Sequence, residues 1–234
     1  MYAKRLRTLS PATAVALAAA FGLVFFYAPV DADQGFVQKI FYLHVPLAIV
    51  ALGGYLAAGV MAIGYLRSRD RRWDARAYVA IHLSTILAVG ALVTGSLWAR
   101  AAWGHWWVWQ EPTLVSFLVI FLMYCTYQPL RFAIEDPDRQ ARYAAVFAIV
   151  AGAFVPLNFM AVRLAQGYTH PRVLSATGGH MPGSMRLTFL ACVVAMALLY
   201  VTPWHLELAV KDLRFSRRRA RRRTEAPART LVAH

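Results

Sequence analysis

One stretch of ten residues, positions 103–112, reads WGHWWVWQEP and holds four of the seven tryptophans of the chain. Indole rings at this density offer a broad, flat, apolar surface, although tryptophan is also enriched where a membrane meets water. If the segment is a helix lying along the surface, Trp103, Trp106 and Trp107 share one face through their i, i+3, i+4 spacing. The stretch is therefore either an interfacial aromatic belt or a shelf for a large planar ligand.

Histidines are the residues that could hold a metal beside such a shelf. Four of the seven histidines fall on the same predicted side of a membrane as the tryptophans: His44, His105, His170 and His180. An intramembrane histidine such as His44 is a functional hypothesis by default, and a hydrogen-bonded interhelical histidine is an equally good explanation. Imidazoles near an aromatic surface, without a cysteine or carboxylate cluster, suit a planar metal macrocycle better than zinc. Haem fits both features, because its iron takes axial histidine and its ring needs an apolar surface.

The elements that position these residues are membrane helices. The chain has 234 residues, is 59% hydrophobic and 15% charged, and has a mean hydropathy of +0.47, which is too apolar for an ordinary soluble domain. About 20 apolar residues are needed to span a membrane. Six such windows occur, at roughly 11–30, 38–66, 77–98, 113–132, 142–164 and 185–204. The alternating segments of a β-barrel are absent, so the sequence predicts an all-α, polytopic bundle of six transmembrane helices.

Basic residues set the predicted orientation of this bundle. Twenty of the 25 Lys and Arg residues lie at the N-terminus, in the 67–76 and 131–142 connections and in the tail from Lys211. The positive-inside rule then places both termini in the cytoplasm and the tryptophan segment on the outer face. Because this alternation accounts for the net charge of +14, the sequence does not predict a nucleic-acid partner.

Two ends of the chain leave alternatives open. We expect residues 1–210 to form the membrane domain and residues 211–234 to form a basic cytoplasmic tail that is disordered. Its run RRRARRR, at 217–223, either anchors the topology or binds acidic headgroups or a partner. The N-terminal KRLR and its apolar run also imitate a signal peptide, so cleavage of the first helix is an open alternative.

Other classes of function find little support. Cys125 and Cys192 fall inside predicted helices and form no CxxC pair, which argues against a thiol oxidoreductase. We also expect no catalytic triad. The competing class is a transporter or channel subunit without haem, in which the tryptophans are only a belt. Such pathways need polar residues midway through helices, and those present are scattered or near helix ends: Thr85, Thr94, Ser96, Asn158 and Gln166.

WGHWWVW, followed by an apolar helix, resembles the WGxWWxWD signature of the haem-handling proteins of cytochrome c maturation. Within that group the six-helix length is similar to the CcmC family, whereas CcmF and CcsA are larger or have more helices. Three further stretches fit the CcmC pattern: KIFYLHVP at 39–46, THP at 169–171, and GG followed by SM within 178–185. The resemblance extends from the second predicted helix to the sixth.

The resemblance implies a function and a set of partners. A CcmC-type protein is expected to bind haem b at the outer face of the bacterial cytoplasmic membrane and to pass it to the haem chaperone CcmE, rather than to act as a conventional enzyme. The expected complex contains the ABC transporter subunits CcmA and CcmB and a CcmD-like small protein.

The resemblance also implies the ligands of the haem iron. His44 matches the histidine of the YxHVP stretch and His170 the loop histidine, so these two are the expected axial ligands. His180 lies in a variable part of the loop and is the runner-up, whereas His105 occupies a variable position and is not expected to be a ligand. The predicted haem-binding set is His44, Arg100, Trp103, Gly104, Trp106, Trp107, Trp109, Glu111, His170 and Arg172.

The segment after WGHWWVW departs from the family pattern. The family has an aspartate, a proline or small residue, and then Arg-Leu-Thr, whereas this chain has WQEPTLVS. Either Gln110 replaces the aspartate, or Gln110 is an insertion and Glu111 takes that place. We favour the insertion, which keeps an acid before the proline but puts Thr113 where the family has arginine. The outward cations Arg100, Arg163 and Arg172 either pair with haem propionates or snorkel to the interface.

Overall fold

The computed structural model describes residues 2–164 and 181–230, and these ranges contain helices and no strand. Six helices are long and apolar enough to cross a membrane, which confirms the predicted all-α class. They are α1 (Tyr2–Gly22), α2 (Phe41–Ser68), α3 (Arg71–Trp103), α4 (Pro112–Phe132), α5 (Pro137–Leu164) and α6 (Gly183–Thr230). A π-helical turn, η1 (Leu23–Tyr27), extends α1, and a 3₁₀ turn, η2 (Phe36–Ile40), leads into α2.

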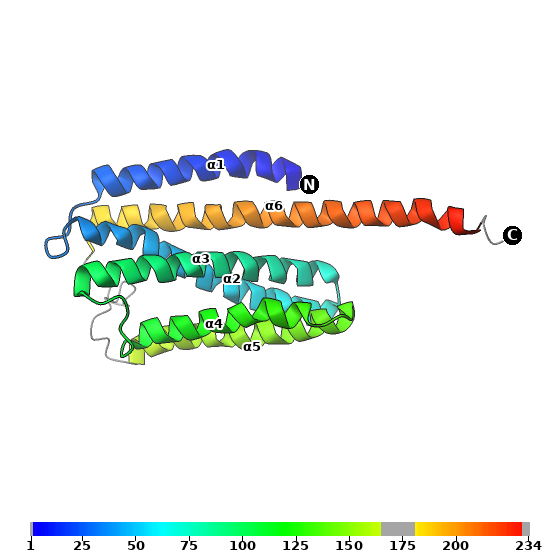
Figure 1. Cartoon of the computed structure of the whole chain (residues 1–234). Helices are drawn as coiled ribbons and strands as arrows, with labels where there is room; N and C mark the ends of the chain where they lie inside the picture. Colours follow the sequence, from blue (N-terminus) through cyan, green and yellow to red (C-terminus); the bar gives the residue numbers. More distant parts are fainter. Residues whose placement is uncertain (1, 165–180, 231–234) are drawn as a thin grey trace.

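The helices form three layers (Figure 1). α1 lies beside α6 on one side, α2 and α3 form the middle, and α4 lies beside α5 on the other side. The start of α1 and the end of α6 lie at the same end of the bundle, and the α3–α4 connection lies at the opposite end. This arrangement agrees with the predicted alternation of connections, while the cytoplasmic side of the termini stays a prediction.

α6 continues beyond residue 210, the predicted boundary of the membrane domain, and is helical as far as Thr230. Its far end extends past the other helices (Figure 1). The division into a membrane domain and a tail stays a prediction.

Small side chains bring α2 and α5 close together. Ala51, Ala58 and Ala62 of α2 are fully buried, as is Ala148 of α5. Small residues at a helix interface in a membrane let the two backbones approach closely. The buried core of these helices, together with α4, is closed by an aromatic pair, Tyr55 and Tyr124, whose rings stack with centroids 3.7 Å apart.

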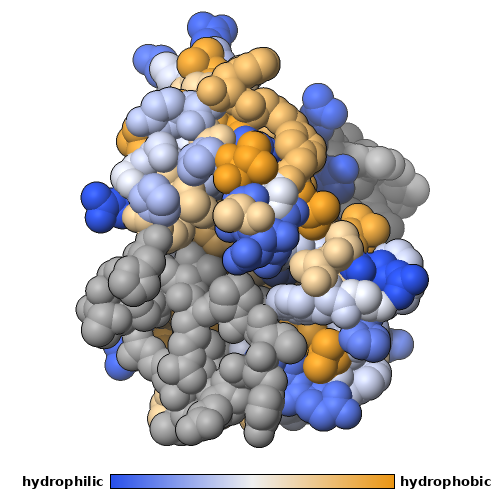
Figure 2. All heavy atoms as spheres, turned by 90° about the vertical axis from the view of Figure 1, so that its left-hand side faces the viewer, coloured by the Kyte–Doolittle hydropathy of each residue, from blue (hydrophilic) through white to orange (hydrophobic). Residues whose placement is uncertain are grey.

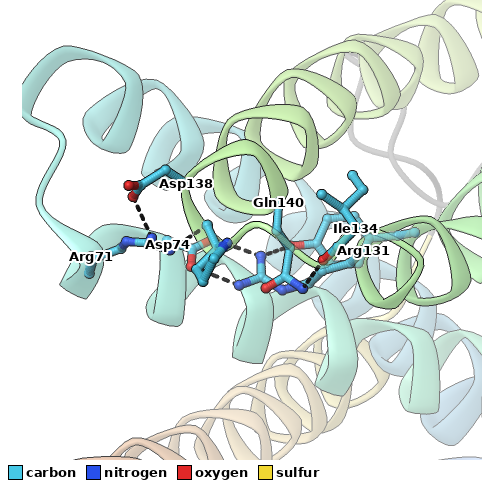
Figure 3. A network of polar contacts seen from close by, with 8 residues as sticks. Arg71, Asp74, Arg131, Ile134, Asp138 and Gln140 are labelled. Carbon is cyan, nitrogen blue, oxygen red and sulfur yellow. Dashed lines mark hydrogen bonds and ion pairs between the residues drawn. The ribbon is translucent and has the colours of Figure 1, made fainter.

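A buried ion pair joins α3 to α4 at the end of the bundle where the termini lie (Figure 3). Both amino groups of the Arg131 guanidinium donate to the Asp74 carboxylate at 2.7 Å, and the Tyr127 hydroxyl lies 3.2 Å from the same guanidinium. About a tenth of each charged side chain is exposed. A second pair in the same view, Arg71 with Asp138, lies at the surface.

We expect Asp74→Ala to lower the free energy of unfolding by about 3–5 kcal/mol, because it leaves the Arg131 guanidinium buried without its counter-charge. Asp138→Ala removes the exposed pair with Arg71 and should cost less than about 1 kcal/mol. Thermal unfolding of the purified variants measures the difference. Equal stability of the two variants would contradict a structural role for the buried pair.

Candidate functional site

The tryptophan segment begins where α3 ends. Gly104 follows the last helical residue, Trp103, and adopts a left-handed conformation with φ of 79°. Its backbone N–H donates to the Arg100 carbonyl at 3.1 Å, a common way to terminate a helix. Regular helix resumes only at Pro112, after the Glu111 cap. The segment is therefore not the surface helix on which Trp103, Trp106 and Trp107 would share a face, because Gly104 ends α3.

Because the backbone after Trp103 is not helical, the four tryptophan side chains differ in exposure. Trp106 and Trp109 are 58% and 68% exposed, whereas Trp103 and Trp107 are half-buried. Trp107 and Trp109 meet at 6.0 Å between centroids and an interplanar angle of 63°. The aromatic surface is therefore not one flat helical face, because Trp107 and Trp109 meet at an angle.

Two polar groups of the segment have specific surroundings. The Arg100 guanidinium donates to the Gly104 carbonyl and lies 5.9 Å from the centroid of the Trp106 ring. The Trp107 Nε1–H is buried and has no hydrogen-bond partner in the part of the chain that the structure describes. A buried indole N–H without an acceptor is unusual, and it would suit an anionic or carbonyl oxygen of a ligand.

His44 lies in the first turns of α2 and contacts α3. Its Nδ1 lies 3.0 Å from the Ala91 carbonyl oxygen and 3.1 Å from Thr94 Oγ1. Thr94 Oγ1 donates its own hydrogen bond to the Gly90 carbonyl at 2.7 Å, so both neighbours of Nδ1 act as acceptors. Nδ1 therefore carries the proton of the neutral ring, and the lone pair that can bind a metal lies on Nε2.

Close packing against α3 fixes the His44 ring. A Cβ added at Gly95 would lie 2.7 Å from His44 Cε1, so only glycine leaves room for the imidazole. Trp98 lies edge-on to the same ring at 5.9 Å between centroids. Trp98 is held in turn, because its Nε1 donates to Gln34 Oε1 at 2.8 Å.

The histidine and the tryptophan segment share one end of the bundle at different depths. Gly95, which contacts His44, precedes Trp103 by eight residues, or about 12 Å along α3. Figure 2 looks onto this end and shows hydrophobic and hydrophilic residues interspersed among the described atoms. The described part of the site is therefore a polar and aromatic outer surface with a fixed imidazole beneath it.

Glu111 is buried and not displayed on the outer surface, with 2% of the residue exposed. It occupies the N-cap position of α4 without a side-chain cap hydrogen bond, at a helix end where the dipole favours a carboxylate, and Thr113 Oγ1 donates to its Oε1 at 3.4 Å. Close by, the Asn158 amide of α5 donates to Ser116 Oγ at 2.6 Å. Sequence reasoning treated Asn158 as a scattered polar residue and missed that it ties α5 to the start of α4. The sequence feature that could have identified Asn158 is a lone amide side chain in an apolar helix.

The remaining predicted residues are not tested by the geometry. His170, Arg172 and His180 lie outside the described residues, and the side chain of Arg163 does as well. The structure thus brings together Arg100 and the tryptophans at one end, with His44 below.

The model of the family described as heme exporter protein C matches residues 1–225. The chain belongs to the heme exporter protein C family. This result confirms the resemblance predicted from WGHWWVW and KIFYLHVP, and it extends the match to α1 and to most of α6.

Relatives named heme exporter protein C match over most of their length. The protein of Paracoccus denitrificans is 34% identical over 183 residues, covering 77% of this chain and 76% of the relative. The protein of Bradyrhizobium diazoefficiens is 34% identical over 195 residues, covering 83% and 73%. The protein of Escherichia coli K12 is 29% identical over 218 residues, covering 87% and 89%.

Proposed function

We propose that this protein holds haem at the end of the bundle that carries the tryptophan segment and passes it to the haem chaperone CcmE. Membership of the heme exporter protein C family supports a role in haem delivery for cytochrome c maturation. The proposal adds haem b as the cargo, the outer face of the bacterial cytoplasmic membrane as the site, and histidine ligation as the means of holding it.

The observation that carries the proposal is the contact of His44 Nδ1 with the Ala91 carbonyl oxygen at 3.0 Å. Haem iron binds a neutral imidazole nitrogen, and a ligating histidine usually donates its other N–H to a carbonyl or carboxylate. The hydrogen bond from Nδ1 to the Ala91 carbonyl supplies this second contact and directs the lone pair to Nε2. Gly95 and Trp98 hold the ring in place, so His44 is preorganised as a ligand.

The tryptophan segment would supply the surface for the porphyrin. Trp106 and Trp109 are exposed aromatic rings above His44, and the buried Trp107 Nε1–H would donate to a propionate oxygen. Arg100 lies against Trp106 in the same region and would offset propionate charge.

We propose His170 as the second axial ligand, with His180 as the alternative, and Arg172 as a further partner for the propionates. His44 and His170 belong to separate segments of the chain. Two neutral imidazoles from separate segments permit the iron to be released one ligand at a time, so that a chaperone can reach the haem edge before the second bond breaks.

The proposed complex contains the CcmA and CcmB transporter subunits and a CcmD-like small protein. In this arrangement the chain acts as a delivery platform and not as a conventional enzyme.

His44→Ala and His170→Ala test the ligand assignment. Each variant, purified from membranes, is expected to lose the Soret band or to show it shifted, because one axial bond to the iron is removed. His105→Ala is the matched control and should keep the wild-type spectrum. An unchanged spectrum in both ligand variants would exclude bis-histidine ligation, and a colourless wild-type protein would favour the transporter subunit without haem.

Gly95→Ala tests whether the packing of His44 matters for binding. The added Cβ at 2.7 Å from His44 Cε1 must displace the imidazole, and loss of such support typically lowers metal affinity about 10-fold or more. Gly90→Ala, whose Cβ would meet Leu47 Cδ1 at an ordinary 3.4 Å, is the control. Haem titration of both purified variants measures the effect, and equal affinities would show that the ring is not positioned by this contact.

A further inference from the structure

A pocket of about 390 Å³ lies between α1, α2, α3 and α6, within the usual size range of small-molecule sites. Nearly all of its lining side chains are apolar. About half or more of the surface of four of them is exposed on the bundle: Phe21, Phe25, Phe36 and Leu97. Because these residues belong to helices long and apolar enough to cross a membrane, we infer that the pocket opens sideways towards lipid.

Lys39 lines this pocket and is a buried cation, with 7% of the residue exposed. Its Nζ donates to the carbonyl oxygens of Val24 at 2.5 Å and Ala28 at 2.9 Å, at the C-terminal end of the first span. An ammonium group has three N–H donors, and no carboxylate of the described residues forms an ion pair with this one. A buried charge is costly unless it is paired, so the site favours an anion.

Tyr42 supplies a second polar group in the same pocket. Only 3% of the residue is exposed, and its hydroxyl has no hydrogen-bond partner among the described residues. A buried hydroxyl without a partner is also costly. Tyr42 follows Lys39 by three residues, about one helical turn deeper from the end of the span. The pocket therefore offers a cation near its outer end and a hydroxyl donor one turn further in.

The depth of these groups matches the parts of a phospholipid. Lys39 lies three residues inside the span that starts at Phe36, about 6 Å in a 3₁₀ turn. With the membrane surface set at Phe36 and a headgroup region roughly 5–8 Å thick, Lys39 lies near the boundary between headgroups and hydrocarbon, close to the phosphate and ester groups of a phospholipid, and Tyr42 lies about one turn deeper. The apolar remainder of the pocket lies where acyl chains begin.

We propose that this pocket binds one anionic phospholipid from the leaflet at the tryptophan end of the bundle. The phosphate pairs with Lys39, an ester carbonyl accepts a hydrogen bond from the Tyr42 hydroxyl, and one acyl chain fills the space between α1 and α3. The lipid is anionic because the amine of a zwitterionic headgroup would offset the negative charge that Lys39 requires. This assignment does not rest on the proposed haem function.

The lipid would also support the imidazole site. Trp98 lines the pocket and lies edge-on to His44. An acyl chain in the pocket therefore packs against the same indole that holds the histidine ring.

Native mass spectrometry of the full chain, purified in detergent and titrated with phosphatidylglycerol or phosphatidylethanolamine, tests the proposal. The wild type should retain one phosphatidylglycerol in preference to phosphatidylethanolamine. Lys39→Met should lower the affinity for phosphatidylglycerol about 10-fold through loss of a charge-assisted contact. Tyr42→Phe should weaken both lipids about fivefold, and Cys192→Phe should exclude both by filling the pocket.

Lys4→Met and Tyr143→Phe are the matched controls, because both residues are exposed on the bundle, and they should bind lipid as the wild type does. If Lys39→Met does not fold, Tyr42→Phe and Cys192→Phe still decide the outcome. Equal retention of the two lipids by the wild type, or wild-type retention by Tyr42→Phe and Cys192→Phe, would overturn the proposal. Added haem is the last test. If haem displaces phosphatidylglycerol from the wild type but not from Tyr42→Phe, the pocket binds a haem carboxylate, and the lipid proposal is overturned.

Discussion

The inability of hydrocarbon to hydrogen-bond the backbone shapes this protein. In lipid every backbone N–H and C=O must be satisfied within the segment, so the six spans are long helices and irregular backbone gathers at their ends. The tryptophan segment and the 28–40 connection both lie at one such end. A groove made by loops can form only there, and any group placed deeper must project from a helix. His44 is the deep group at this end, and it reaches a backbone carbonyl of α3 because Gly95 leaves room for its ring.

The spans were predictable from sequence, because about 20 consecutive apolar residues have few alternatives to a membrane helix. The conformation of the tryptophan segment could not be predicted from sequence, because i, i+3, i+4 spacing places residues on a shared face only if the helix continues. Gly104 ends α3. The sequence shows this glycine, but neither composition nor periodicity reveals that it takes a left-handed conformation with an N–H bonded to Arg100.

Burial was equally hard to predict for polar residues near helix ends. Topology counts Lys39 as an outward cation, yet its side chain turns inward to the carbonyls that end the first span. Glu111 was selected by its place in a motif and lies buried at the start of α4. In both cases a helix terminus with unsatisfied backbone groups attracts the opposite charge. The Lys39 contacts join elements that are adjacent only after folding, so no local pattern predicts them.

The two parts of the proposed site differ in how firmly they are held. His44 has both of its Nδ1 acceptors on α3 and a ring packed by Gly95 and Trp98, whereas Trp106 and Trp109 are exposed on non-helical backbone. A protein that delivers a cofactor must bind it specifically and still give it up. In the proposed site, a preorganised nitrogen would supply specificity for the iron, and an exposed aromatic surface would leave the porphyrin edge open to a recipient. The division between a rigid ligand and an open surface is therefore the arrangement that delivery requires, since a fully enclosing pocket would strengthen binding and also block transfer.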